Sequence, residues 1–263
     1  MRSRTAVVAG LVLVLLSAGC ANGKPTSSSS SPLPYPPIPL VSATPSVAPT
    51  TPPPAKPARK PAARARIGPL NTQRMTGVRA VALTFDDGPH PRWTPKLLDQ
   101  LRQAKVKATF CVLGVRVKSY PALVRRIVRE GHTLCNHSWR HDLDLGSRST
   151  GQIRADLRRT NQEIQRAVPG VRIPYYRQPG GRWTPAIVQV SRELGMKPLH
   201  WDVDPADWDD TSTPEISKRV AQQARPGSIV LLHDGGGDRS RTLGACPTVI
   251  SSLKRKYGIT RLR

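Results

Sequence analysis

The stretch Val81-Ala82-Leu83-Thr84-Phe85-Asp86-Asp87-Gly88-Pro89 decides how this chain of 263 residues folds. Its first five residues form a short apolar run that is typical of a buried strand, and Gly88-Pro89 marks a turn. Two carboxylates lie between the strand and the turn. Neighbouring side chains of a strand point to opposite faces, so beyond the strand end Asp86 and Asp87 can take separate roles.

Similar apolar runs alternate with amphipathic stretches from about Val78 to Arg263, which predicts an α/β fold with parallel strands. The expected strands are 80–85, 108–113, 132–136, 175–177, 197–202 and 228–232. Helical patterns lie between them at 94–104, 121–130, 150–167, 184–194, 213–225 and 242–256. A series of such units indicates a barrel, in which the carboxyl ends of the strands converge on one mouth.

Charged and imidazole side chains follow the carboxyl ends of these expected strands. They are Asp86, Asp87, His137, His141, Arg177, Asp202 to Asp207, and His233. Active sites of (β/α) barrels lie at this end, so these residues should meet in one pocket. The i, i+4 spacing of His137 and His141 suits two imidazoles to one metal ion on a helical turn.

Five motifs occur in order in this part of the chain. They are Thr84-Phe85-Asp86-Asp87-Gly88-Pro89, His137-Ser138-Trp139-Arg140-His141, Arg177-Gln178-Pro179-Gly180-Gly181, Asp204-Pro205-Ala206-Asp207-Trp208 and Leu231-Leu232-His233. Together they resemble the motifs of the polysaccharide deacetylases, the NodB homology domain of carbohydrate esterase family 4. The resemblance covers the globular part from Val78 onward, and it implies a distorted (β/α)7 barrel that removes acetyl groups from a polysaccharide.

The resemblance implies a metal site at the mouth of this barrel. Asp87, His137 and His141 would hold a divalent ion, with zinc as the first choice and cobalt or another divalent ion as alternatives. Such an ion polarises a carbonyl group and lowers the pKa of water.

It also implies an acid and a base beside the metal. Asp86 would be the general base, paired with Arg177, and must be near the metal without binding it. His233 would be the general acid that protonates the departing amine. Asp207 would orient His233 and favour its protonated form.

Three further residues would bind the acetyl group. The backbone N–H of Gly180 would bind the oxyanion, while Trp208 and Leu231 would form an apolar slot for the methyl group. Many relatives carry a tyrosine at the position of Gly180. Glycine keeps the N–H but lacks the ring, so oxyanion binding should survive without that ring's contact to the sugar.

The N-terminus predicts export. Two arginines within residues 1–4 precede the apolar run 6–16, and Leu16-Ser17-Ala18-Gly19-Cys20 resembles the bacterial lipobox. The apolar run is too short to span a bilayer, which needs roughly 20 residues. We expect a leader at 1–20, lipidation of Cys20 and an extracytoplasmic protein anchored to the cell membrane. An ordinary secretory signal is the alternative.

A linker should separate this leader from the catalytic domain. Pro, Ser, Thr and Ala dominate residues 24–63, a composition that cannot bury a core. We expect a disordered basic linker at 21–77 and the catalytic domain at 78–263. The formal net charge of +24 favours anionic partners such as wall polymers. The export signal argues against nucleic acid.

Two cysteines fall in neighbouring expected strands. Cys111 and Cys135 could form a disulfide in an oxidising compartment, or they could remain two buried thiols. Cys246 should be a small residue of the core.

The leading functional hypothesis is peptidoglycan N-deacetylation, at the N-acetylglucosamine or N-acetylmuramic acid unit. Deacetylation of chitin-like oligomers or of acetylated xylan is the alternative, because members of the family act on them with the same residues. A non-catalytic wall-binding lipoprotein is a third hypothesis. The presence of Asp86 and His233 disfavours it.

Overall fold

The strand that precedes the acidic pair, β1 (Ala82–Asp86), lies between β2 and β6 in a parallel sheet. The computed structural model describes residues 66–263 and arranges six strands there in the order β5-β4-β3-β2-β1-β6. The other strands are β2 (Thr109–Val112), β3 (Thr133–Asn136), β4 (Tyr175–Tyr176), β5 (Lys197–Pro198) and β6 (Ile229–His233). All of the pairs between these strands are parallel, as expected for strands that alternate with helices.

The chain after β5 connects the two edges of the curled sheet. It runs from the β5 edge to the β6 edge. Leu199 N–H donates to Tyr176 O of β4 at 2.8 Å. Val203 then pairs in parallel with Val230 of β6. This bridge stands where a seventh strand would close the expected barrel. The α/β barrel type is therefore confirmed, with six strands in the described part of the chain and the bridge at Val203 in place of a seventh strand.

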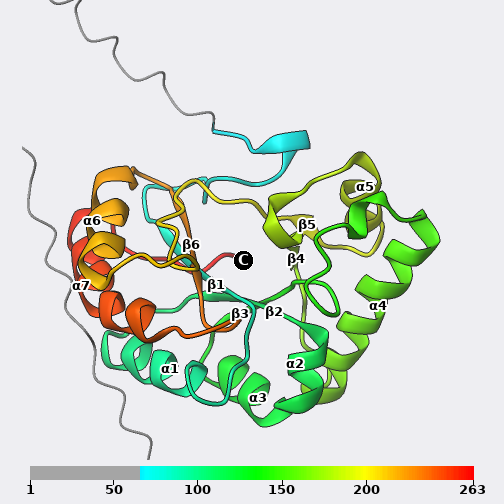
Figure 1. Cartoon of the computed structure of the whole chain (residues 1–263), viewed down its shortest axis with the longest axis horizontal. Helices are drawn as coiled ribbons and strands as arrows, with labels where there is room; N and C mark the ends of the chain where they lie inside the picture. The colour runs from blue at the N-terminus through cyan, green and yellow to red at the C-terminus, as the bar shows by residue number, and fades with distance from the viewer. Residues whose placement is uncertain (1–65) are drawn as a thin grey trace, which may run out of the picture. The chain divides into compact units, whose positions relative to one another are not determined.

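Helices cover the outside of the curled sheet (Figure 1). They are α1 (Thr94–Gln103), α2 (Gly114–Ser119), α3 (Pro121–Arg129), α4 (Thr150–Ala167), α5 (Pro185–Glu193), α6 (Thr213–Gln223) and α7 (Ser240–Lys256), with 3-10 turns η1 (Pro69–Asn71), η2 (Leu145–Ser147) and η3 (Pro179–Gly181). Local chemistry sets their starts. At α4, Ser149 and Gln152 form a reciprocal capping box, and α3 begins with a proline at its first position. The sequence analysis did not predict α2, whose six residues include two β-branched valines.

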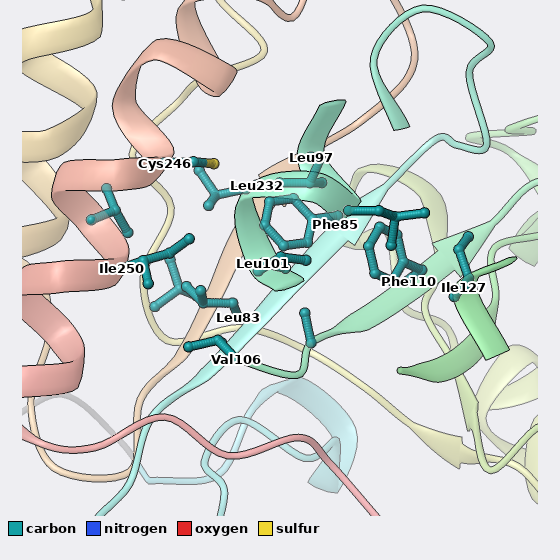
Figure 2. Close-up of a cluster of buried hydrophobic side chains, with 14 of the residues drawn as sticks. Leu83, Phe85, Leu97, Leu101, Val106, Phe110, Ile127, Leu232, Cys246 and Ile250 are labelled. Carbon is teal, nitrogen blue, oxygen red and sulfur yellow. The ribbon is translucent and has the colours of Figure 1, made fainter. Parts of the chain in front are cut away.

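The main core lies between the outer face of the sheet and the helices. Leu83 and Phe85 of β1 point into it and are fully buried (Figure 2). Phe85 stacks on Phe110 of β2 at a centroid distance of 5.5 Å. Leu101 of α1 and Ile250 of α7 belong to the same cluster (Figure 2). Apolar burial of this kind is the main source of stability of the barrel.

A second, smaller cluster fills the inside of the barrel. Its members are Ala82, Cys111, Cys135, Tyr175, Leu199, Ile229 and Leu262. Cys111 and Cys135 are register partners on β2 and β3, and the structure joins them in a disulfide with a Cα–Cα distance of 4.2 Å. Cys246 is a free, buried cysteine of the main core.

The C-terminal tail covers the amino end of the barrel. Ile259 pairs in parallel with Val81, which directly precedes β1. Thr133, at the start of β3, donates through its hydroxyl to Leu262 O at 2.7 Å. Because Leu262 is buried in the inner cluster, the tail closes the end of the barrel opposite the carboxyl ends of the strands.

Residues 67–76 also contact the barrel, although the sequence analysis placed them in the linker. Gln73 N–H donates to Pro198 O at 2.8 Å, and Thr76 N–H donates to Gly227 O at 2.8 Å. Met75 pairs antiparallel with Ser228. These backbone bonds need no apolar periodicity, which is why composition did not indicate them.

The leader, Cys20 and most of the expected linker lie outside the described residues. Within residues 66–263, no helix combines the length and apolar character that crossing a membrane requires.

Candidate active site

The acidic pair is set at the carboxyl end of β1 by a tight turn. Asp87 has a positive φ of 72°, which turns its side chain away from the strand direction. A Cβ on Gly88 would lie 2.3 Å from a carboxylate oxygen of Asp234, so only glycine fits there. This close approach explains the glycine that follows the two aspartates.

Two histidines from the loop after β3 reach Asp87. The Nδ1 atom of His137 is hydrogen-bonded to Arg177 O at 2.8 Å, which turns Nε2 toward the carboxylates. The Nε2 atoms of His137 and His141 each lie 3.4 Å from Asp87 Oδ1. The loop is not the helical turn that the spacing predicted, because Ser138 and His141 have positive φ values of 68° and 63°.

These three side chains fit a divalent metal ion. Their donor atoms all lie within 4.8 Å of one another. Bonds of about 2.0–2.1 Å in a tetrahedral site would place donors roughly 3.3 Å apart, close to the observed separations. Asp87 Oδ1 is buried and has no hydrogen-bond partner among the described residues, which is the expected state of a ligand atom.

The charge states of Asp87 and His141 also suit metal binding. Burial opposes ionisation of Asp87, but His137, followed by the other nearby histidines, outweighs burial and lowers its pKa. The carboxylate is therefore ionised. Burial lowers the pKa of His141, which favours the neutral imidazole that metals require.

Asp86 lies next to the metal-binding trio but has a different partner. Arg177 Nη1 donates to Asp86 Oδ1 at 2.7 Å and to Thr84 Oγ1 at 2.8 Å. The Arg177 side chain is fully buried, and it needs this carboxylate because an unpaired buried charge is costly. The other oxygen, Asp86 Oδ2, is 3.6 Å from His137 Nε2. This second oxygen therefore lies beside the trio.

His233, at the end of β6, is paired with Asp207. The Nδ1 atom of His233 is 2.7 Å from Asp207 Oδ1, and its backbone N–H donates to Asp207 Oδ2 at 2.9 Å. Thr242 Oγ1 donates to the same Oδ2 at 2.8 Å. Burial lowers the pKa of His233, but Asp207 and then the acidic pair outweigh burial and raise it to about 9. The imidazole is therefore protonated at neutral pH and can donate a proton.

The turn at Gly180 and Gly181 lies in η3 and has positive φ values of 60° and 64°. A Cβ on Gly180 would lie 2.9 Å from Leu143 Cδ2. A Cβ on Gly181 would lie 2.7 Å from Trp201 Cη2. The turn is thus held between two apolar side chains, and its positive φ values favour glycine at both positions.

The two residues expected to form the acetyl slot differ in exposure. Leu231 is buried on β6, two residues before His233. Trp208 is 55% exposed and lines a cleft of about 400 Å³ together with Asp207 and Arg239. Leu231 is not part of the lining of that cleft.

One aspartate that the sequence analysis grouped with the pocket lies elsewhere. Asp202 accepts from Ser228 Oγ at 2.7 Å and pairs with Arg225 at 2.8 Å and Arg74 at 3.1 Å. Ser228 directly precedes β6, so Asp202 belongs to the amino end of the barrel. The strand expected at 197–202 ends at Pro198, and the crossing chain carries Asp202 away from the site.

Asp234 is a buried acid of this region that the sequence analysis missed. Its N–H donates to Asp86 O at 3.0 Å, and Thr94 Oγ1 donates to its carboxylate at 2.5 Å. Burial raises the pKa of Asp234 to about 7. The one sequence feature that could have indicated Asp234 is its position directly after His233.

Arg239 is a second missed residue, and it is also buried. It donates to Asp207 O at 3.0 Å and to Gly235 O at 2.6 Å, and so ties two loops of the site together. No spacing rule in the sequence points to it.

Comparisons with known proteins agree with this geometry. The family model described as polysaccharide deacetylase matches residues 73–199. A chitooligosaccharide deacetylase of Rhizobium leguminosarum bv. trifolii is 40% identical over 186 residues, 66% of this chain and 86% of the relative. A peptidoglycan-N-acetylglucosamine deacetylase of Bacillus cereus is 37% identical, over 68% of this chain and 83% of that protein. The solved family 4 carbohydrate esterase from Streptomyces lividans, in complex with acetate, has a TM-score of 0.63 at 33% identity, over 69% of this chain and 91% of that one.

Proposed function

Because the chain belongs to the polysaccharide deacetylase family and is a hydrolase of non-peptide carbon–nitrogen bonds, we propose that it is a metal-dependent peptidoglycan N-deacetylase. The observation that carries the proposal is the trio Asp87, His137 and His141, flanked by Asp86 and by His233. It supplies metal ligands, a carboxylate base and a protonated imidazole at one end of the barrel.

A divalent ion bound by the trio would supply Lewis-acid polarisation of the acetyl carbonyl and would lower the pKa of water. Two imidazoles and one carboxylate suit zinc, and they also accept cobalt or another divalent ion. We propose zinc as the resident metal.

Asp86 is the general base in this proposal. Its ion pair with Arg177 fixes one oxygen, so that the other oxygen can take a proton from water. The 3.6 Å separation between Asp86 Oδ2 and His137 Nε2 places the base beside the metal ligands.

His233 is the general acid. Asp207 holds Nδ1, which leaves Nε2 to protonate the amine as the carbon–nitrogen bond breaks. Arg239 and Thr242 act on Asp207 and not on substrate, so they are positioning residues.

The acetyl group would be held by three residues. The N–H of Gly180 binds the carbonyl oxygen as it gains negative charge. Trp208 and Leu231 would flank the methyl group, and a slot that fits only a methyl group would exclude longer acyl chains.

The choice of peptidoglycan rests on where the enzyme would work. The leader at 1–20 with its lipobox cysteine would tether it to the outer side of the cell membrane, next to the wall. The Cys111–Cys135 disulfide supports this location, since disulfides persist in oxidising compartments. The net charge of +24 favours an anionic wall matrix.

Chitooligosaccharide deacetylation is the second candidate, favoured by the relative from Rhizobium. Acetylated xylan has no such relative among those described above. A non-catalytic wall-binding role is disfavoured because both the base and the acid are present and paired.

The test is acetate release, with mass spectrometry of the glycan before and after treatment. Purified peptidoglycan, chitotetraose and acetylated xylan are offered to the metal-loaded protein. We expect peptidoglycan fragments to lose one acetyl mass on an identified sugar. Acetate release from chitotetraose alone would favour the second candidate. Inactivity on all three substrates would contradict the enzymatic proposal.

A further inference from the structure

An exposed apolar side chain stands beside the turn that presents Gly180. Leu143, two residues after His141, is 37% exposed. A Cβ on Gly180 would lie 2.9 Å from Leu143 Cδ2, so the leucine side chain already occupies the space over this glycine. The side chain of Leu143 thus fills the space that a side chain at position 180 would occupy.

The loop that carries Leu143 is fixed by bonds on both of its sides. Gln178 Nε2 donates to Asp142 O and to Leu143 O, each at 3.4 Å. Arg182, which follows the glycine pair, binds Asp144 at 2.9 Å. The loop and the glycine turn therefore form one unit, in which Leu143 is held in place without being buried.

We propose that Leu143 is an apolar platform for the sugar ring that lies over Gly180, and hence a specificity-determining residue. This inference rests on the proposed function. A sugar ring presents an apolar face of C–H groups and a polar edge of hydroxyl groups. A ring whose acetyl carbonyl reaches the Gly180 N–H passes next to Leu143, and its C–H face can cover the exposed leucine and remove it from water.

Two substitutions at Leu143 and one control test the platform. Leu143→Ala removes the apolar contact, while Leu143→Asn keeps a similar shape and removes only the apolar character. Leu70→Ala is the control, because Leu70 is a similarly exposed leucine, at 45%, in η1. With zinc-loaded protein and whichever of soluble peptidoglycan fragments or chitotetraose the wild type deacetylates, we expect both Leu143 variants to lose about tenfold in kcat/KM, mainly through a higher KM.

Zinc content and melting temperature should match the wild type in all three variants, and Leu70→Ala should keep the wild-type kcat/KM. A Leu143→Ala variant with wild-type kcat/KM and KM would overturn the platform. An Asn variant that behaves like the wild type while the Ala variant is impaired would also overturn it, since shape and not apolar contact would then matter.

A double-mutant cycle tests the contact itself. Gly180→Ala should impair the enzyme partly through the clash with Leu143 and partly through its positive φ. Adding Leu143→Ala should relieve the clash, so that Gly180→Ala costs less activity in the Leu143→Ala background. Equal costs in the two backgrounds would contradict the packing on which the proposal rests.

These outcomes remain distinct from failure of the proposed function. A wild-type protein that releases no acetate from chitotetraose or peptidoglycan contradicts the enzymatic proposal. An active wild type with unaffected Leu143 variants contradicts the platform alone.

Discussion

The two faces of β1 are both buried, but their chemistry differs. The outward side chains Leu83 and Phe85 lie in the apolar core against the helices. The inward side chains change along the strand from Ala82 through Thr84 to Asp86. Outward residues stabilise the barrel, whereas Asp86 is a buried carboxylate that needs a partner and is the proposed general base. Substitutions on the two faces should therefore separate stability from activity.

The largest effect on activity is expected for the proposed metal ligands, which lie beside Asp86 at the end of the inward face of β1. His137→Ala removes one of three donors, so zinc content measured by mass spectrometry should fall close to background. Loss of a group that only supports a metal ligand costs up to about 100-fold in activity. Loss of a ligand itself should therefore lower acetate release by more than that. His132→Gln is the control, because His132 is a buried histidine that accepts from Ala108 N–H, away from the trio. An unchanged zinc content in His137→Ala would contradict the ligand assignment.

Asp86→Asn should have the next largest effect. The variant keeps the shape of the side chain but loses the base, so turnover should fall by roughly 10²–10⁴. Zinc content should stay at the wild-type level, because the three donors are untouched. Normal turnover in a zinc-loaded Asp86→Asn protein would remove the general-base assignment.

Asp207→Asn tests the other side of the site through pH. The pKa of His233 is raised to about 9 in the folded protein, above its ordinary value of 6.5. The stabilisation from this pairing is therefore complete below pH 6.5 and lost as pH rises through 9. Removing the carboxylate should lower the pKa of His233 by about 1–3 units and shift the alkaline limb of the kcat/KM profile downward.

At pH 8 the Asp207→Asn variant should lose about tenfold or more in kcat/KM, and at pH 6 it should lose less. The stability difference from the wild type should also shrink as pH rises toward 9 and beyond. A profile with an unmoved alkaline limb would mean that another group donates the proton.

The smallest effect on activity is expected on the outward face. Leu83→Ala should lower the free energy of unfolding by about 2–5 kcal/mol in urea titrations, because it leaves a cavity in the core. Turnover per folded, zinc-loaded molecule should stay within about twofold of the wild type. A fully folded Leu83→Ala protein with strongly reduced turnover would show that the two faces are not separable.

The positions and parallel type of the strands, and the positions of most of the long helices, could be predicted because apolar runs and turn residues are local signals. The carboxyl ends of β1, β3 and β6 carry Asp86, His137 and His233 as the pattern predicted. Parallel topology brings these ends together whatever the details of the loops.

Features that depend on close packing could not be predicted. The bridge at Val203, which turns Asp202 toward the amino end of the barrel, follows from the crossing chain and not from any periodicity. The packing of Leu143 over Gly180 and the hydrogen bonds of Arg239 to two loops form between separate segments of the chain. Such contacts carry no signal in one sequence.

The pairing of β1 with β6 has a consequence for how the protein reaches its folded state. Ala82 must find Ile229, and Gln73 must find Pro198, before the barrel is complete. Contacts between such distant segments form slowly, since the intervening loop must close first. A nascent chain that lacks its last third can pair β1 with β2 but not with β6, so the edge of β1 that meets β6 stays open until the C-terminal segment has been made.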